Sequence, residues 1–137
     1  MADRVEFELV SPAKLLVSEP VEMVVVPGED GDFGVLPGHA PVISLVRPGV
    51  IDIHEDGRVS RRIFVAGGFA EVTPERCTVL AEEAQPVEDI DAALAGERLA
   101  AARTAVDNPE DDDERAQRAG LRELRAAEAL VAAAQQG

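Results

Sequence analysis

The sequence has no tryptophan or tyrosine, and its aromatic residues are four phenylalanines among 137 residues. It has one cysteine, Cys77, so an intramolecular disulfide is excluded and a reducing compartment is favoured. Apolar residues still make up 46% of the chain. A hydrophobic core can therefore form, and it must be built from Val, Leu, Ile and Ala.

Positive charge is also scarce. The chain has 13 Lys and Arg against 27 Asp and Glu, which gives a formal net charge of −14. Such a chain repels phosphate backbones and anionic headgroups, which argues against nucleic-acid binding and direct membrane docking. No apolar run approaches the ~20 residues of a membrane span, so no membrane insertion is expected. The acidic N-terminus, with Asp3, Glu6 and Glu8, is unlike a signal or transit peptide.

Motifs for catalysis, cofactors and metals are missing as well. Val35 and Leu36 follow Gly34 where a phosphate-binding loop requires Lys and Ser or Thr. His39 and His54 lack the Cys or His companions of a zinc site, and there is no Gly-x-Ser-x-Gly elbow. We therefore expect no catalytic residue, no cofactor site and no metal site, and a chain that is not an enzyme.

Residues 4–84 show short apolar segments separated by turn residues. Val5, Phe7 and Leu9 alternate with charged residues, which predicts a half-buried strand. Asp56-Gly57 lies between two further segments and predicts a tight hairpin turn. Eight to ten short strands at this spacing indicate a β-sandwich or a flattened barrel.

The composition changes at Pro86, since 15 of the 50 residues from Glu88 onward are alanine. This predicts two helices, over about 90–105 and 110–135, with Asn108 as N-cap and Pro109 as first residue of the second. The acidic run at 110–114 would then lie at the positive end of the helix dipole. The chain is expected to divide into a sandwich domain, 1–86, and a helical hairpin domain, 87–137.

Both predicted helices carry a stripe of small apolar residues, which favours an antiparallel hairpin. The stripes are Ala95, Leu99, Ala102 and Val106 in the first helix, and Ala116, Gly120, Leu124, Ala127, Val131 and Ala134 in the second. Because each buried alanine contributes little, the hairpin should dock weakly on the sandwich.

Four arginines, Arg115, Arg118, Arg122 and Arg125, fall on one face of the second helix. One interpretation is a solvated face with Asp111–Arg115 and Glu114–Arg118 pairs. The other is a contact with an acidic partner, because a basic stripe on so acidic a chain is unusual.

Residues 26–41 read VPGEDGDFGVLPGHAP, and their glycines and prolines surround the apolar tetrad 33–36. Gly31 and Gly38 allow positive φ angles, while the prolines stiffen the chain. The segment is either an ordered two-turn connection between strands or a rigid loop that presents Asp32 and His39.

This segment resembles the signature of the epsilon-subunit family of F-type ATP synthases, named delta in mitochondria. The resemblance continues through LVRPG at 45–49, VAGGF at 65–69, VLAE at 79–82 and the helical tail. It implies a ten-stranded sandwich followed by an antiparallel two-helix hairpin. It also implies a non-catalytic central-stalk subunit on the cytoplasmic face of the bacterial inner membrane, which links gamma to the c-ring and couples proton flow to ATP synthesis.

The resemblance further implies roles for individual residues. Asp32 matches the loop carboxylate that faces the c-ring and His39 the histidine near gamma, with Phe33 and Gly34 at the same interface. A second function is inhibition of ATP hydrolysis, in which the arginine stripe contacts the alpha and beta subunits. A third is ATP sensing, but Leu94 in IDAALA (90–95) replaces the arginine of the family motif Ile/Leu-Asp-x-x-Arg-Ala. We therefore predict no ATP binding tighter than roughly millimolar.

Overall fold

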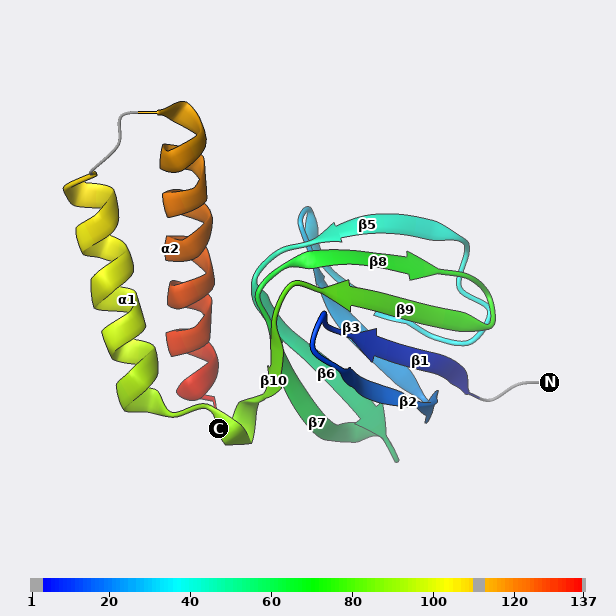
Figure 1. Cartoon of the computed structure of the whole chain (residues 1–137). Helices are drawn as coiled ribbons and strands as arrows, with labels where there is room; N and C mark the ends of the chain where they lie inside the picture. The colour runs from blue at the N-terminus through cyan, green and yellow to red at the C-terminus, as the bar shows by residue number, and fades with distance from the viewer. Residues whose placement is uncertain (1–3, 110–112, 137) are drawn as a thin grey trace.

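The computed structural model describes residues 4–109 and 113–136, which form a sandwich of strands with a pair of helices at one end (Figure 1). The strands are β1 (Val5–Val10), β2 (Leu15–Val21), β3 (Met23–Gly28), β4 (Gly31–Val35), β5 (Val42–Val46), β6 (Gly49–Glu55), β7 (Arg58–Val65), β8 (Gly68–Val72), β9 (Arg76–Ala81) and β10 (Ala84–Pro86). A 3-10 turn, η1 (Val87–Asp89), leads to the helices α1 (Ala92–Asp107) and α2 (Glu114–Ala134). The predicted order of strands followed by two helices is confirmed.

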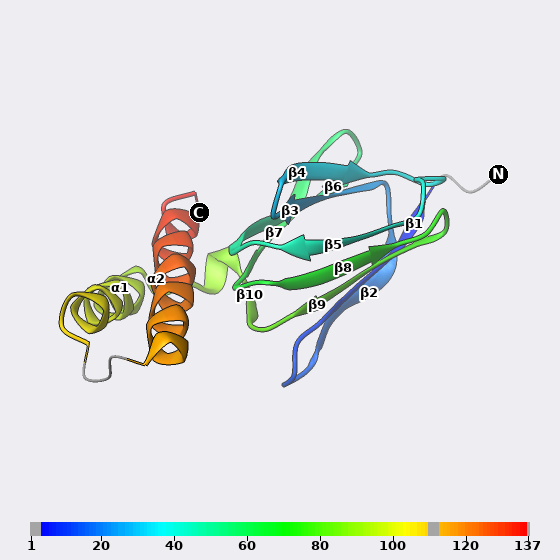
Figure 2. The same cartoon turned by 90° about the horizontal axis from the view of Figure 1, so that it is seen from above.

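The strands follow the order β10-β7-β6-β3-β5-β8-β9-β1-β2, with β4 paired to β3. The β1–β9 pair is parallel and the other pairs are antiparallel. Between β3 and β5 a single pair, Gly28 with Val46, joins the strands, and there the sheet folds into two layers (Figure 2). One layer holds β5, β8, β9, β1 and β2, and the other holds the remaining strands. The ten-stranded sandwich implied by the resemblance is confirmed.

The core lies between the two layers and is aliphatic, as the composition predicts. Val5, Phe7 and Leu9 of β1 are fully buried, and their charged neighbours face outward, which confirms the predicted half-buried strand. Asp56 and Gly57 both have positive φ angles, 53° and 76°, which is the conformation expected of a two-residue hairpin turn.

The helix boundaries differ from the prediction. Asp113, not Asn108, caps α2, because its carboxylate accepts a hydrogen bond from the Arg115 backbone at 3.2 Å. The Asn108 backbone N–H instead donates to Thr104 and ends α1. The acidic residues 110–112, and with them the predicted Asp111–Arg115 pair, lie outside the described residues.

The hairpin docks on the edge of the sandwich through a second apolar cluster, formed by Phe64, Val87, Ala95, Leu130 and Ala133. The predicted alanine stripe of α2 is therefore only part of its buried surface. Gly120 of that stripe lies against Val106 of α1, but Ala116 is exposed. The predicted stripe left out Leu130 and Ala133, which pack with Phe64 and Val87 of the sandwich end and with Ala95 of α1. No helix in the described ranges is long and apolar enough to cross a membrane.

Candidate partner-binding surfaces

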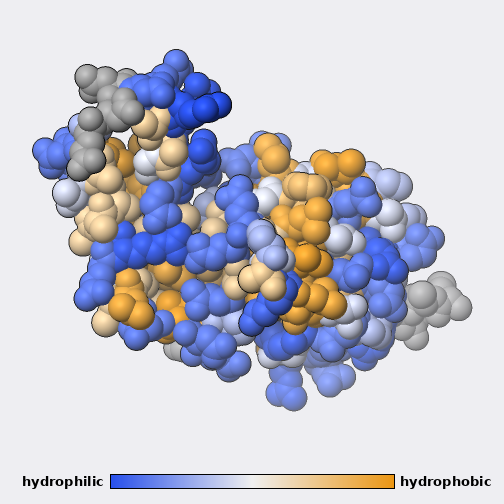
Figure 3. All heavy atoms as spheres, in the orientation of Figure 1, coloured by the Kyte–Doolittle hydropathy of each residue, from blue (hydrophilic) through white to orange (hydrophobic). Residues whose placement is uncertain are grey.

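A row of exposed apolar side chains crosses the outer face of the β5–β8–β9–β1–β2 layer. Leu45 pairs with Phe69, Phe69 with Leu80, Leu80 with Val10, and Val10 with Leu15. Because neighbouring strands lie about 4.8 Å apart, the row is about 19 Å long. Figure 3 shows it as an orange patch on the sandwich.

The exposure of this apolar row is large for residues in the middle of a sheet. The exposed fractions are 66% for Leu45, 44% for Phe69, 41% for Leu80 and 56% for Leu15, and Ile43 beside them reaches 71%. Single exposed apolar residues are ordinary, but a contiguous patch marks an interaction site. Sequence analysis missed it, since the row runs across five strands and only the register between them aligns its residues.

The segment 26–41 is the two-turn connection of the first interpretation, and half of it is strand. It contains the end of β3, a turn, β4 and the passage to β5. Asp32 is the second residue of β4, and its carboxylate accepts a hydrogen bond of 2.6 Å from Arg47, whose other nitrogen donates to the Gly28 carbonyl at 2.7 Å. Phe33 packs partly against the core and Gly34 is exposed. Asp32 is thus accessible but already paired.

His39 lies beyond the other end of β4, so the structure does not bring it together with Asp32. Its Nδ1 is 2.7 Å from the Ala40 carbonyl oxygen. The Gly38 N–H donates to the Pro74 carbonyl at 2.7 Å and anchors this turn to the β8–β9 turn. The φ angles of Gly31 (134°) and Gly38 (86°) confirm the predicted positive values.

One guanidinium, that of Arg98 in α1, ties together three elements that are distant in sequence. It donates to both carboxylate oxygens of Glu83, in the β9–β10 turn, at 2.8 and 3.0 Å, and to both of Glu123, in α2, at 2.9 Å. These hydrogen bonds raise the pKa of Arg98, and the bond to Glu123 has the larger effect, followed by the bond to Glu83. In turn, the hydrogen bond from Arg98 lowers the pKa of Glu123. We call this set the Arg98 clamp; it shows that the docking of the hairpin does not depend on alanine faces alone.

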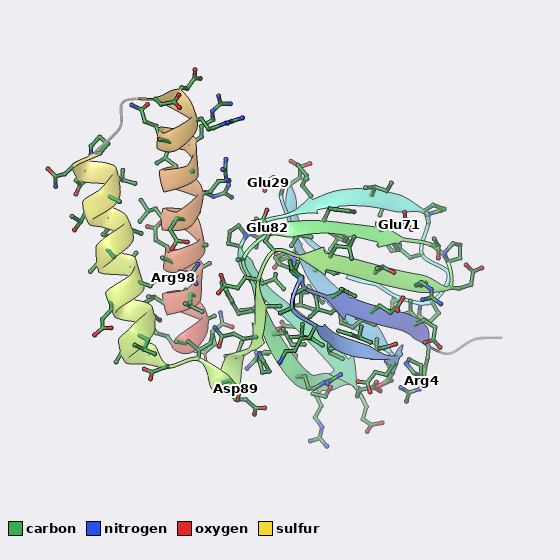
Figure 4. The ribbon with its side chains drawn as sticks, viewed as in Figure 1. Arg4, Glu29, Glu71, Glu82, Asp89 and Arg98 are labelled. Atoms are coloured by element: carbon green, nitrogen blue, oxygen red, sulfur yellow. The ribbon has the colours of Figure 1, made fainter. Side chains whose placement is uncertain are left out.

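The arginine stripe is divided between solvent and the sandwich. Arg118 lies 3.6 Å from Glu114 on the exposed part of α2, as predicted. Arg125 instead pairs at 3.2 Å with Glu29 of the β3–β4 turn, an acidic neighbour that sequence spacing could not reveal. Figure 4 shows Glu29 and Glu82 on the side of the sandwich nearest α2.

Arg98, Arg122 and Arg125 line a cleft of about 450 Å³ between α2 and the sandwich, whose opposite wall includes Leu45 and Gly67. The basic groups are balanced by Glu29, Glu82, Glu83 and Glu123, which line the same cleft. Leu94 stands exposed at the start of α1 and offers no donor to a phosphate. In the described part of the chain, no group of three or more His, Cys, Asp or Glu could hold a metal ion.

Comparison with known proteins matches residues 4–87 to the family described as ATP synthase, Delta/Epsilon chain, beta-sandwich domain. The ATP synthase epsilon chain of Paramagnetospirillum magneticum is 58% identical over 97% of this chain and 98% of its own length. The ATP synthase epsilon chain of Rhodospirillum rubrum is 56% identical, again over 97% of this chain and 98% of its own length. Among solved structures, a chain of the Euglena gracilis mitochondrial ATP synthase OSCP/F1/c-ring assembly superposes with a TM-score of 0.80, at 27% identity over 97% of this chain and 82% of that one. A chain of the Tetrahymena thermophila mitochondrial ATP synthase central stalk and c-ring shares the fold, with a TM-score of 0.65 at 14% identity over 95% and 96% of the two chains.

Proposed function

The chain belongs to the ATP synthase delta/epsilon chain family, and on that premise we propose that it is a non-catalytic rotor subunit that fastens gamma to the c-ring. In that position it couples proton flow to ATP synthesis and lies peripherally on the cytoplasmic face of a bacterial inner membrane. The observation that carries the proposal is the exposed apolar row, because a contiguous apolar patch on the surface marks an interaction site.

We assign the apolar row to gamma, because a permanent rotor contact needs an apolar centre and few buried charges. Replacing Phe69 with Glu would bury a charge there, and we expect it to weaken binding to isolated gamma about a hundredfold. Leu121→Glu is the matched control, since Leu121 is similarly exposed but lies on α2. Calorimetry with purified gamma measures both, and equal affinities for the two variants would place the gamma contact elsewhere.

We assign the β3–β4 hairpin to the c-ring through Asp32, which keeps enough exposure to accept a second arginine beside Arg47. Asp32→Arg should lower proton pumping in the assembled enzyme more than Asp56→Arg, which reverses a carboxylate in an exposed turn. A charge pair at a partly buried interface can contribute a few kcal/mol, whereas an exposed one contributes under ~1. Equal loss of pumping in both variants would contradict the assignment. His39, by its family position, stays with the gamma contact.

Inhibition of ATP hydrolysis by the hairpin is the second activity, with the arginine stripe contacting acidic groups of the alpha and beta subunits. Arg115, Arg118 and Arg122 have no ion pair with the sandwich in the described residues, so they can be changed without removing the Arg125–Glu29 contact. Replacing these three with Ala should raise hydrolysis at low salt and have less effect at high salt. Arg103→Ala on α1 is the control. Unchanged hydrolysis at low salt would show that the stripe is only a solvated face.

ATP sensing is the alternative function, favoured by the three arginines of the cleft. Two observations weigh against it: Leu94 lacks a donor, and the Arg98 guanidinium already bonds two carboxylates. The loss of one charged hydrogen bond costs about tenfold to a hundredfold in affinity, so binding should be no tighter than roughly millimolar. Calorimetric titration of the isolated chain with ATP tests this, and micromolar binding would establish the sensor function.

A further inference from the structure

Strand β5 has a neighbouring strand on only one of its two sides over most of its length. It pairs with β8 at all five of its residues, but with β3 only at Val46. Successive residues of a strand direct their backbone groups to opposite sides. The Leu45 carbonyl accepts a hydrogen bond of 2.9 Å from the Glu29 N–H on the side away from β8, so Ile43 directs its N–H and C=O to that side as well. No strand of the described chain pairs with Ile43 there, and β5 runs along the top of the sandwich in Figure 1.

This free edge of β5 lacks the residues that protect an edge strand from pairing with another chain. Charged side chains and proline are the usual protection. Other strands with a single partner carry them, since Glu19 and Pro20 lie in β2, Asp32 in β4 and Pro86 in β10. Residues 42–46 read VISLV, without a charge or a proline. The edge of β5 is therefore open to a further strand.

The apolar row, which the proposed function assigns to gamma, is too small by itself for a permanent contact. It is about 19 Å long and about 7 Å wide, on the order of 130 Å², whereas a stable interface buries about 800 Å² on each partner. The row does not widen along the strands, because Glu71 and Glu8 occupy the next outward positions of β8 and β1. It does continue at β5, where Ile43 is 71% exposed and Val42, on the inner face, is 39% exposed.

We propose that an extended segment of gamma adds to the free edge of β5 as a further strand, with apolar side chains at alternate positions. The inference rests on the proposed gamma contact and says how gamma is held. Neighbouring strands lie about 4.8 Å apart, so the outward side chains of the added strand lie beside Ile43 and Leu45 and lengthen the apolar row. Glu29 bonds to Leu45 and Glu71 pairs with Ile43, so the added segment carries no acidic residue beside them.

Proline at position 43 tests the backbone contact separately from the side chain. Ile43→Pro removes an N–H that points away from β8 and so leaves the β5–β8 hydrogen bonds in place, whereas Ile43→Ala removes the side chain and keeps the N–H. We expect calorimetry with purified gamma to show at least about tenfold weaker binding for Ile43→Pro than for Ile43→Ala. Urea unfolding of both full-length variants checks that they fold. Equal affinities in two folded variants would overturn the inference.

Hydrogen exchange of the unchanged full-length chain is a second measurement, which stands even if Ile43→Pro does not fold. In the free chain the Ile43 amide should exchange faster than the Ser44 amide, which points at β8, and gamma should slow it at least about tenfold. Fast exchange of Ile43 in the complex would overturn strand addition alone if Phe69→Glu still weakens gamma binding. If Phe69→Glu has no effect either, the gamma contact fails together with strand addition. Protection of Ile43 that rises with chain concentration in the absence of gamma would identify a second copy of the chain as the occupant and would also overturn the inference.

Discussion

Arg98 and Glu83 are joined by two hydrogen bonds, of 2.8 and 3.0 Å, and this pair connects the helical hairpin to the sandwich. The same guanidinium holds Glu123, so α1 and α2 are joined to each other by the other half of the clamp. Breaking the Glu83 half would release the hairpin from the sandwich with its two helices still connected. The clamp therefore separates two events, undocking of the hairpin and opening of the hairpin.

Glu83→Gln should loosen the docked hairpin while α1 and α2 stay paired. A charge-assisted pair would contribute up to ~3 kcal/mol if buried, and its partial exposure reduces the expected effect to about 1 kcal/mol. Hydrogen exchange should therefore speed up along the sandwich-facing residues of α2. Glu82→Gln is the control, since Glu82 forms no ion pair with a described residue. Equal exchange in the two variants would show that apolar packing alone holds the hairpin.

Acid should weaken the Glu123 half of the clamp. The hydrogen bond from Arg98 lowers the pKa of Glu123 in the folded protein. The stability that Glu123 contributes is therefore fully present above its pKa in the unfolded chain, and it is lost as the pH falls through its pKa in the folded protein. We expect the urea midpoint of the full chain to fall between pH 5 and pH 3, both rough bounds around the ordinary glutamate pKa. In Glu123→Gln this fall should be smaller. An identical pH profile in both proteins would contradict the assigned pKa shift.

The sandwich should fold without the hairpin, with the boundary near residue 87. Its main core cluster is made of strand residues alone, and the hairpin contributes to the separate cluster around Phe64. A fragment of residues 1–87 should show a cooperative, β-rich unfolding transition at a lower midpoint than the full chain, because Phe64 and Val87 become exposed. Circular dichroism during urea unfolding checks this. A disordered fragment would mean that the two parts form one folding unit.

Cys77 should be nearly inert in the folded protein. It is fully buried in β9, and burial raises the pKa of its thiol to about 12, so its thiolate population at pH 8 falls about a thousandfold. Ellman's reagent should react with it only at the rate of unfolding and within seconds in urea. Ser18→Cys on the exposed edge of β2 gives the reference rate. Fast labelling of native Cys77 would show local opening of β9.

Gly68→Ala should destabilise the sandwich by more than ~2 kcal/mol. Gly68 has a φ of 138°, and an added Cβ would lie 2.0 Å from the Leu80 carbonyl oxygen, so β8 and β9 would have to separate. Gly96→Ala provides the contrast, because that site in α1 is open and alanine should stabilise the helix by up to ~1 kcal/mol. Thermal unfolding of both variants measures the difference. A neutral effect at Gly68 would contradict the close strand contact.

The sequence predicted the features that depend on neighbouring residues. The alternation of Val5, Phe7 and Leu9 placed a half-buried strand, and Asp56-Gly57 placed a hairpin turn. Helix ends were less predictable, since Asn108 and Asp113 are both good capping residues and the sequence alone does not rank them. The candidate sites followed the family resemblance, so Asp32 and His39 were named together although β4 separates them.

By itself, then, the sequence determined the order of elements, the aliphatic character of the core and the family, because strand and helix periods and turn residues act over a few positions. The tertiary structure alone decided which side chains meet. The apolar row exists because β-register aligns Leu45, Phe69 and Leu80, and the clamp exists because folding brings Arg98 to Glu83 and Glu123, 15 and 25 residues away. Contacts at such separations depend on how the layers pack, a property of the whole chain that no local pattern contains.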